Sequence, residues 1–431
     1  MASQIEIEPV SAPLDASIRP PGSKSLTNRA LVCAALARGR SILQGALASE
    51  DTRVMIDALK TLGISISEAD QGRTLEIDGC GGTIPSHGAE LYIANSGTTV
   101  RFLTALVSLA DGDFRLHGTP RMHERPISDL LESLAELGVN ARSEAGTGCP
   151  PVVIRADGLH AARVAMRGDV SSQFLSALLM AAPYAQPSVT ASQLEIDITG
   201  ELVSKPYVDM TIAVMEAFGA RVTRSAVATH FGIPPAVYQA RRYEIEPDAS
   251  AASYFWAAAA ISGGRVRVEG LDRTSLQGDV AFCDCLAQMG CEVEYFGRGT
   301  SVTGKPLRGI EIDMNAISDT VQTLAAVALF ADGPTTIRGV AHIRHKETDR
   351  IGALACELRK LGVRVDEHHD GLTIVPGKLR PAVIETYDDH RMAMSMALVG
   401  LRVPGVVIDD PDCTNKTYPN YFGDLARLST K

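Results

Sequence analysis

The sequence repeats one pattern six times with a period of about 72 residues, which is typical of a repeat architecture. In each copy a polar or charged cluster precedes a run of small apolar residues. The clusters are Ser23-Lys24-Ser25, Ser96-Gly97-Thr98, Ser171-Ser172-Gln173, Asp248-Ala249-Ser250, Ser318-Asp319-Thr320 and Asp388-Asp389-His390-Arg391. The apolar runs are 30–37, 102–110, 174–182, 254–261, 324–331 and 392–401. A repeat of this kind constrains the architecture before any single residue is interpreted.

A second series of residue pairs is offset from the first and has the same period. Its members are Leu62-Gly63, Leu137-Gly138, Phe218-Gly219, Met289-Gly290 and Leu361-Gly362. A glycine after the last apolar residue predicts the end of an amphipathic helix, and the alternating segments that follow predict strands. The sixth copy, near Phe422-Gly423, is degraded.

The apolar runs are apolar nearly all round, and such helices belong in a core with strands outside them. We therefore predict an α/β protein of two domains with three repeats each. The boundaries are placed at residues 21–243 for the first domain and at 1–20 plus 244–431 for the second. The irregular segment 225–247 is interpreted as the linker that returns to the second domain.

The composition excludes several classes of protein. A net charge of −10 argues against general binding of nucleic acid, and no apolar run approaches the roughly 18 residues that span a bilayer. The eight cysteines form no paired framework, so buried reduced thiols are favoured over disulfides or a metal site. The first residues resemble no signal peptide. We expect a cytoplasmic protein.

The polar clusters stand where the buried helices are predicted to begin, and a helix N-terminus can bind an anion. Two further clusters are 119–126, with two arginines between prolines, and 345–350, in which Lys346 and Arg350 would share one face of a helical first turn. The latter combines a base, an acid and a guanidinium, which suits proton transfer beside an anion. Asp389 is a candidate to orient the ring of His390.

Taken alone, capping or a solvated turn explains each of these clusters as well. Their coincidence with the repeat is more informative, since seven cations lie at or near helix starts or in linking loops: Lys24, Arg29, Arg125, Lys346, Arg350, Arg391 and Lys416. In an acidic protein, such a concentration of positive charge indicates a site for a phosphorylated substrate.

From about residue 9 to 422 the chain resembles the 5-enolpyruvylshikimate-3-phosphate (EPSP) synthase family, the 3-phosphoshikimate 1-carboxyvinyltransferases. The motifs that carry the resemblance are 21–29, 95–98 with Arg101, 120–126, 171–174, 204–207, 346–350, 389–392 and 412–418. The resemblance implies two inside-out α/β barrel domains, each of three βαβαββ units, with buried helices and sheets outside. It implies transfer of the enolpyruvyl group of phosphoenolpyruvate to the 5-hydroxyl of shikimate 3-phosphate, in the shikimate pathway of aromatic amino-acid biosynthesis.

The resemblance also implies roles for particular residues. Asp319, Glu347 and Lys24 would be catalytic. The shikimate 3-phosphate site would comprise Lys24, Ser25, Arg29, Ser171, Ser172, Gln173, Ser204, Tyr207, Asp319, His342 and Lys346. The phosphoenolpyruvate site would comprise Lys24, Gly97, Arg125, Gln173, Arg350, Arg391 and Lys416. It implies no metal, no cofactor, no nucleic-acid or membrane partner, and a monomer.

Two positions differ from better-known members of the family. His342 stands where asparagine often binds the sugar phosphate, and histidine can still donate a hydrogen bond there. Phe102 stands where many members carry proline, which could shift Gly97 and Thr98. The resemblance nevertheless implies inhibition by glyphosate, because Gly97 leaves room where insensitive relatives carry a larger residue.

Three other functions remain as alternatives. An enolpyruvyl transferase acting on UDP-N-acetylglucosamine should carry a cysteine near 121–126, and none is present there. An RNA 3′-phosphate cyclase has related repeats, but nothing in the sequence indicates a nucleotide site. A ring-shaped DNA clamp would need helices lined with lysine and arginine, whereas the repeated helices are apolar.

Overall fold

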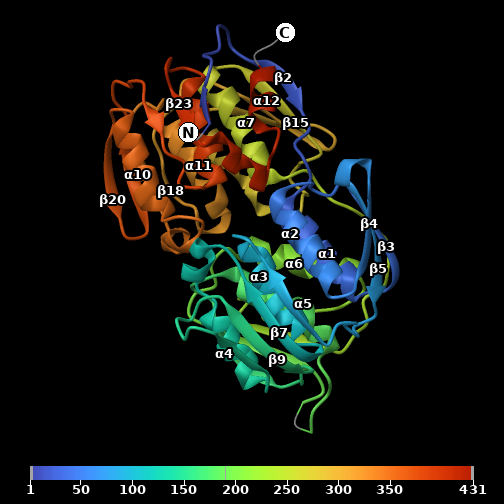
Figure 1. Ribbon diagram of the computed structural model, residues 1–431. Coiled ribbons are helices and arrows are strands. Elements are labelled where there is room, and N and C mark those ends of the chain that lie inside the picture. Colours follow the sequence, from blue (N-terminus) through green and yellow to red (C-terminus); the bar gives the residue numbers. More distant parts are fainter. Residues whose placement is uncertain (1–2, 190, 429–431) are drawn as a thin grey trace. The chain divides into compact units, whose positions relative to one another are not determined.

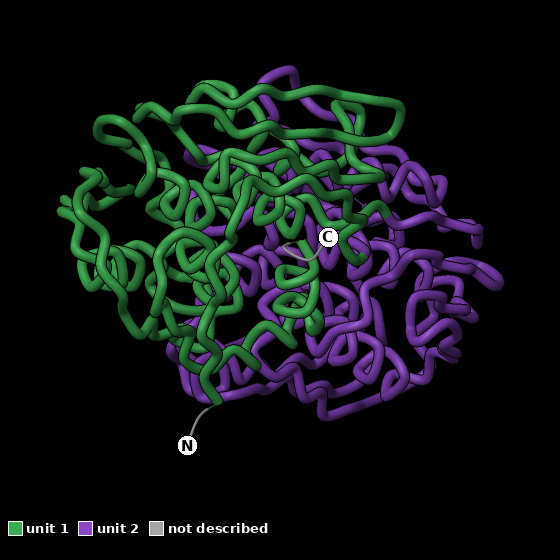
Figure 2. The backbone as a smooth tube through the Cα atoms, turned by 90° about the horizontal axis from the view of Figure 1, so that it is seen from above, with its two compact units in different colours: residues 1–21, 246–431 green, residues 22–245 purple. Residues whose placement is uncertain are grey.

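The computed structural model describes residues 3–189 and 191–428 (Figure 1). The chain divides into two compact units. Unit 1 comprises Met1–Pro21 and Glu246–Lys431, and unit 2 comprises Gly22–Ile245 (Figure 2). The chain therefore passes between the units twice, at Pro21 and at Ile245. Within the described residues no helix has the length and hydropathy needed to cross a membrane.

The strands are short in both units. Those of unit 2 are β3 (Arg38–Gln44), β4 (Ser65–Ala69), β5 (Thr74–Cys80), β6 (Gly88–Tyr92), β7 (Asp111–His117), β8 (Asn140–Ser143), β9 (Val152–Asp157), β10 (Arg163–Arg167), β11 (Leu194–Thr199), β12 (Thr223–Arg224), β13 (His230–Ile233) and β14 (Arg242–Glu244). Those of unit 1 are β1 (Gln4–Glu6), β2 (Asp15–Ile18), β15 (Arg265–Glu269), β16 (Glu292–Tyr295), β17 (Gly299–Thr303), β18 (Glu311–Asp313), β19 (Thr335–Arg338), β20 (Arg364–His368), β21 (Gly371–Val375), β22 (Val383–Ile384) and β23 (Val407–Asp409).

The described strands form six sheets that share one topology. In unit 2 the strand orders are β14-β3-β5-β4, β6-β7-β9-β8 and β10-β11-β13-β12. In unit 1 they are β2-β15-β17-β16, β18-β19-β21-β20 and the shorter β22-β23-β1. In every sheet the first two strands are parallel and the strands that follow are antiparallel. The structure thus confirms the α/β class and the six repeats.

Strands distant in the sequence complete three of these sheets. The N-terminal strand β1 pairs with β23, with Ile5 opposite Ile408, and β2 pairs with β15. In unit 2 the sheet of β3 is completed by β14. The prediction that segment 225–247 is an irregular linker is therefore wrong in part, because the segment contains the whole of β13 and β14. Each strand is too short to produce a visible alternation.

The first helix of each repeat is buried, as predicted. These helices are α1 (Lys24–Leu36), α3 (Gly97–Val107), α5 (Ser172–Ala181), α7 (Ala249–Ser262), α9 (Val321–Ala328) and α11 (His390–Gly400). In unit 1, α7, α9 and α11 pack against one another, and in unit 2, α3 packs against α1 and α5. Their many alanines allow this close approach. The core of each unit is a separate cluster of buried residues.

The second helix of each repeat has an exposed face. These helices are α2 (Glu50–Thr61), α4 (Ser128–Glu136), α6 (Lys205–Ala217), α8 (Phe282–Gln288), α10 (Arg350–Lys360) and α12 (Tyr421–Arg427). The glycines predicted to end the first five have positive φ, for example 89° at Gly63 and 95° at Gly219. Such a conformation strains any other residue. The sixth glycine, Gly423, lies inside α12, in agreement with a degraded copy.

The close approach of the N-terminal segment to the rest of unit 1 can be tested at Gly264. A Cβ atom there would lie 2.1 Å from the backbone nitrogen of Leu14, whereas at Gly377 the nearest atom would be 3.7 Å away. We expect Gly264→Ala to lower the free energy of unfolding by about 1–3 kcal/mol, as overpacking does. Gly377→Ala should change it by roughly 0.5 kcal/mol or less.

Urea unfolding followed by tryptophan fluorescence would measure this difference. Trp256, the single tryptophan, is buried in unit 1 and reports on that unit. Equal stability of the two variants would contradict the packing of the N-terminal segment against β15.

Candidate active site

In unit 2 each of the three buried helices begins at a capping serine. Ser23, Ser96 and Ser171 each accept a backbone N–H from the first turn of α1, α3 and α5. The other N–H groups of a first turn have no partner within the helix, and together with the helix dipole they attract anions. The predicted residues Lys24, Gly97 and Ser172 are the first residues of these helices, so the sequence clusters do lie at helix starts.

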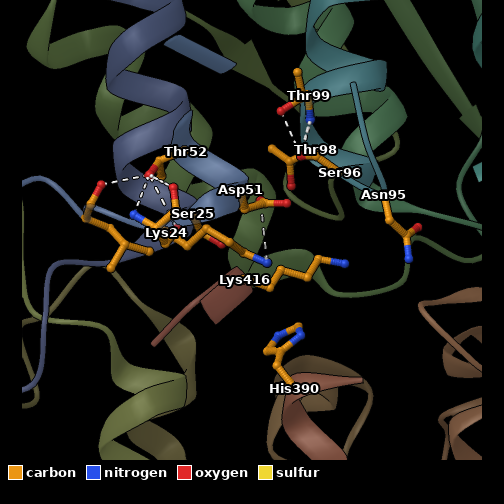
Figure 3. A network of polar contacts seen from close by, with 12 residues as sticks. Lys24, Ser25, Asp51, Thr52, Asn95, Ser96, Thr98, Thr99, His390 and Lys416 are labelled. Atoms are coloured by element: carbon orange, nitrogen blue, oxygen red, sulfur yellow. Dashed lines mark hydrogen bonds and ion pairs between the residues drawn. The ribbon is translucent and has the colours of Figure 1, made fainter. Parts of the chain in front are cut away.

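Lys24 is held by a carboxylate from the neighbouring helix. Its Nζ lies 3.9 Å from Oδ2 of Asp51, which is buried in the first turn of α2 (Figure 3). This distance is an ion pair without a hydrogen bond. Ser25 follows in α1 and is half-buried.

Arg29 is buried, and its guanidinium bonds to the protein itself. It donates to Thr211 Oγ1 (2.7 Å), to the backbone oxygens of Ser25 (2.9 Å) and Tyr207 (3.2 Å), and to Ser176 Oγ (3.5 Å). Burial lowers the pKa of Arg29 to about 10. Arg29 thus ties α1 to α5 and α6, a role that the sequence did not predict.

Phe102 packs against this arginine. The Cζ atom of Arg29 lies 5.3 Å from the centre of the Phe102 ring, a cation–π distance, and the ring is buried. α3 begins at Gly97 with its serine cap intact. The start of this helix is therefore regular, although Phe102 stands where many members of the family carry proline.

Gly97 lies between two guanidinium groups. A Cβ atom at this position would be 2.4 Å from Nη2 of Arg125 and 2.9 Å from Nη1 of Arg101. Arg125 also donates to the backbone oxygen of Asn95 (2.9 Å) and to its Oδ1 (3.1 Å). No side chain fits at Gly97 unless an arginine moves.

Gln173 is fixed at both ends of its amide. Its Oε1 accepts from Arg101 Nη1 at 2.6 Å, and its Nε2 lies 3.3 Å from Thr98 Oγ1. Arg101 in turn donates to the backbone oxygen of Pro126 (3.0 Å). Arg101 stood in a sequence motif but was given no role. Its spacing of four residues from Gly97, one helical turn, is the signal that could have identified it.

Ser204 and Tyr207 lie at the start of α6. Ser204 has a left-handed backbone, with φ of 53°, and its backbone oxygen accepts from Tyr207 N at 3.0 Å. The backbone oxygen of Tyr207 accepts from Arg29. These contacts connect the start of α6 to α1, so unit 2 brings Ser25, Arg29, Ser204 and Tyr207 together.

In unit 1, Asp319 is the centre of a network of cations. Its Oδ1 accepts from Lys346 Nζ (3.3 Å) and Arg350 Nη1 (3.2 Å), and its Oδ2 accepts from Arg391 Nη2 (2.7 Å). The four residues come from the 3₁₀ helix Asn315–Thr320, the segment before α10, α10 and α11. Two successive repeats therefore meet at one carboxylate.

A second carboxylate, Glu347, extends this network. It accepts from Arg350 Nη2 (2.8 Å) and from Lys416 Nζ (3.2 Å). Arg350 is 1% exposed and also donates to both oxygens of Asp389, at 2.7 and 3.2 Å. Burial alone would lower the pKa of Arg350, but the charges of Asp389, Glu347 and Asp319 raise it above its ordinary value.

We name these residues the unit 1 cluster. It joins four cations to three carboxylates: Lys346, Arg350, Arg391 and Lys416 with Asp319, Glu347 and Asp389. Within this cluster the three carboxylates neutralise three of the four positive charges. One positive charge remains to attract an anionic ligand. Asp389 has no role among the sequence predictions except beside His390.

Two predictions about this cluster are wrong in detail. Lys346 does not lie in a helical first turn, because Asp349 caps α10 by accepting from Ile351 N and Gly352 N, so the helix begins at Arg350. Asp389 does not hydrogen-bond the ring of His390, since its Oδ1 lies 3.8 Å from Nδ1 and is directed to Arg350 instead. The bidentate bond to a guanidinium is the stronger interaction.

His342 and Asp279 are buried titratable groups in unit 1. Burial, and then the charge of Lys346, lower the pKa of His342 to about 3, so its imidazole is neutral at pH 7. Burial, and then the charge of Asp319, raise the pKa of Asp279 to about 6. Ser250 Oγ donates to Asp279. Asp279 was not predicted, and no motif around it indicated a role.

The chemistry available to these residues is anion binding and proton transfer. Cationic groups at helix starts suit phosphate and carboxylate, and ionised carboxylates can accept protons. Among the described residues, no group of histidine, cysteine and carboxylate side chains has the arrangement of a metal site. The eight cysteines are free thiols.

The chain is similar over nearly its whole length to known proteins. The sequence model of EPSP synthase (3-phosphoshikimate 1-carboxyvinyltransferase) matches residues 9–425. A 3-phosphoshikimate 1-carboxyvinyltransferase from Nostoc punctiforme is 50% identical, with 97% of each chain covered, and one from a Marinomonas species is 46% identical, with 97% and 98% covered. The solved structure of EPSP synthase from Acinetobacter baumannii has a TM-score of 0.81 at 25% identity, covering 99% and 98% of the two chains.

The lowered pKa of His342 predicts how its replacement changes stability with pH. Below its ordinary pKa of 6.5 the unfolded chain binds a proton that the folded chain excludes down to about pH 3. Stability is therefore lost as the pH falls below 6.5, by up to about 1.4 kcal/mol per pH unit. We expect His342→Asn to lose less stability than the parent protein between pH 7.5 and 5.

Urea unfolding at several pH values, followed through Trp256, would measure this difference. Asp279 acts in the opposite direction, because its raised pKa favours the folded state at low pH, but it is present in both proteins and cancels. His369→Asn, at an exposed position of the same unit, is the control. Parallel pH curves for His342→Asn and the parent would mean that His342 takes up its proton at the same pH in the folded and unfolded chains, which would contradict the lowered pKa.

Proposed function

The chain belongs to the EPSP synthase family, and we propose that its helix-start cations bind the two substrates of the family's reaction. It is a 3-phosphoshikimate 1-carboxyvinyltransferase, an enzyme of the shikimate pathway that makes aromatic amino acids. It transfers the enolpyruvyl group of phosphoenolpyruvate to shikimate 3-phosphate. The observation that carries the assignment of residues is the network around Asp319, which joins one carboxylate to three cations.

Shikimate 3-phosphate is the ligand of the hydroxyl, amide and basic groups at the starts of α1, α5 and α6. Capped helix starts and hydroxyls suit its phosphate and its ring hydroxyls. The neutral His342 donates one hydrogen bond to the phosphate, as an asparagine would. The full set is Lys24, Ser25, Arg29, Ser171, Ser172, Gln173, Ser204, Tyr207, Asp319, His342 and Lys346. Arg29 acts through the backbone of Ser25 and Tyr207, because its guanidinium donates to the backbone oxygens of both residues.

Phosphoenolpyruvate is the ligand of the arginine-rich part. Its carboxylate and phosphate are planar or tetrahedral anions that guanidinium groups bind through paired N–H donors. Gly97 allows the approach of a small anion to Arg125, because any side chain there would occupy the space. The full set is Lys24, Gly97, Arg125, Gln173, Arg350, Arg391 and Lys416.

Asp319, Glu347 and Lys24 move the protons. Asp319 is ionised by its three cations and accepts the proton of the 5-hydroxyl, whose oxygen forms a bond to C2 of phosphoenolpyruvate. Glu347, which contacts Arg350 and Lys416, protonates the C3 methylene from its carboxylic acid form. In the elimination, Glu347 takes a proton back from the new methyl group as the C2–O bond to phosphate breaks, and the leaving phosphate takes the proton that Asp319 had accepted. Cations stabilise the charge on the tetrahedral intermediate throughout.

Phosphate release tests this function. Phosphoenolpyruvate would be mixed with the protein and either shikimate 3-phosphate or UDP-N-acetylglucosamine, with no metal added. Release with shikimate 3-phosphate alone is the expected result. Release with the nucleotide sugar alone would mean that UDP-N-acetylglucosamine is the acceptor. No release with either compound would mean that the cationic groups bind an anion but do not catalyse this reaction.

We place the enzyme in the cytoplasm as a monomer, with small molecules as its substrates and without a nucleic-acid or membrane partner. Eight free thiols and a net charge of −10 support this placement.

Replacement of Glu347 tests the proton steps. We expect Glu347→Gln to lower kcat by about 10²–10⁴-fold, because the amide keeps the shape of the side chain but transfers no proton. Glu292→Gln, at an exposed ion pair with Lys305 in the same unit, should leave kcat unchanged. Steady-state kinetics at saturating substrates would measure both, and a Glu347→Gln enzyme with full kcat would remove Glu347 from the mechanism.

Replacement of Gly97 tests the position of Arg125. We expect the parent enzyme to be inhibited by glyphosate, an anion small enough for the space at Gly97. Gly97→Ala should raise the KM for phosphoenolpyruvate by about 10- to 100-fold and weaken inhibition by glyphosate, since its Cβ would displace Arg125. Inhibition assays would measure both effects. Full activity of the parent enzyme in millimolar glyphosate would contradict the assignment.

A further inference from the structure

The segment that leads into α11 has an unusual backbone. Tyr387 and Asp388 are consecutive residues with positive φ, 57° and 53°, and neither is glycine. Such conformations are strained and persist only where the surrounding structure enforces them. The next residue, Asp389, caps α11 and binds Arg350, and Arg391 follows two residues later. The strained turn therefore sets the start of the helix that carries part of the unit 1 cluster.

One buried carboxylate holds this turn in place. Glu357, on α10, is 0% exposed, and its Oε1 accepts from the Tyr387 hydroxyl at 2.7 Å. Its Oε2 accepts from the backbone N–H of Glu385 at 3.1 Å. Lys360 Nζ lies 2.8 Å from Oε1 and balances the charge. Burial, and then the bond to Glu357, raise the pKa of Tyr387, so its hydroxyl remains a donor.

The same helix also holds the other end of the segment. Arg350 and Glu357 are seven residues apart, two helical turns, so they lie on one face of α10. Glu357 binds the segment at Glu385 and Tyr387, and Arg350 binds it at Asp389. The backbone bond from Asp389 N to Thr386 O, 2.9 Å, closes the turn between these two attachments.

We infer that Glu357 and Tyr387 are positioning residues: their hydrogen bond holds the strained turn so that Asp389 meets Arg350 and Arg391 points to Asp319. Neither residue contacts the unit 1 cluster through any hydrogen bond described for it. They act through the backbone of the turn. In the enzyme their contribution is to phosphoenolpyruvate binding by Arg350 and Arg391, and this part of the inference rests on the proposed function.

Tyr387→Phe removes one hydroxyl and tests the inference with little risk to folding. The freed turn should relax, and kcat/KM for phosphoenolpyruvate should fall about tenfold, with a smaller change in the KM for shikimate 3-phosphate. Tyr238→Phe is the matched control, because its buried hydroxyl donates to Met180 O at 3.0 Å in unit 2. It should lower thermal stability by a similar amount and leave kcat/KM unchanged.

A second substitution separates positioning from stability alone. Glycine adopts positive φ without strain. Asp388→Gly added to Tyr387→Phe should therefore recover most of the lost kcat/KM. Glu357→Gln keeps one acceptor oxygen and should lie between the parent and Glu357→Ala.

Amide hydrogen exchange gives a readout that does not require activity. Exchange at Glu385, Asp389 and Arg391 should become faster in Tyr387→Phe and stay at the parent rate in Tyr238→Phe. Unchanged exchange and unchanged kcat/KM in Tyr387→Phe would overturn the inference. Faster exchange in Tyr387→Phe, together with a parent protein that has no activity with either acceptor, would overturn the proposed function while upholding the positioning role.

Discussion

A helix without a polar face can meet water only at its ends. The six buried helices of this protein are of that kind, and each unit surrounds them with short strands and half-exposed helices. The unpaired N–H groups of a buried helix must still find partners at its first turn. Serines and aspartates cap five of these six helices, and the charged groups that follow the caps become the reactive part of the molecule. The layering of the fold thus decides where its chemistry can be.

The second constraint is electrostatic. A buried guanidinium such as Arg350 is costly unless it is paired, and three carboxylates surround it. Removal of any one of them would leave charge uncompensated rather than simply delete a contact. Two of these carboxylates, Asp319 and Glu347, are the proposed proton carriers, so groups that make the cations tolerable in the empty enzyme also perform the reaction. An anionic substrate then competes with these carboxylates for the cations of the unit 1 cluster.

The sequence predicted the parts of the structure that depend on neighbouring residues. The six buried helices follow from repeated runs that are apolar nearly all round, and the ends of five outer helices follow from the conformational freedom of glycine. It could not predict what depends on distant contacts. The partners of Arg29 include Ser176 and Thr211, which lie far along the chain. The sequence prediction placed Lys346 in the first turn of a helix, whereas α10 begins at Arg350 because Asp349 is its cap. It also paired Asp389 with the adjacent His390, although Arg350, from another repeat, binds Asp389 more strongly.

The pairing of β1 and β2 with strands near the other end of the sequence has a consequence for synthesis on the ribosome. These two strands emerge first, yet their partners β15 and β23 are made after the whole of unit 2. Unit 2 has all its strands once β14 has been made. β2 has to wait, unpaired, until β15 follows unit 2, and β1 has to wait for almost the full length of translation. Charged residues alternate with isoleucine in Ile5-Glu6-Ile7-Glu8, and such charges suit a strand that stays soluble while it waits.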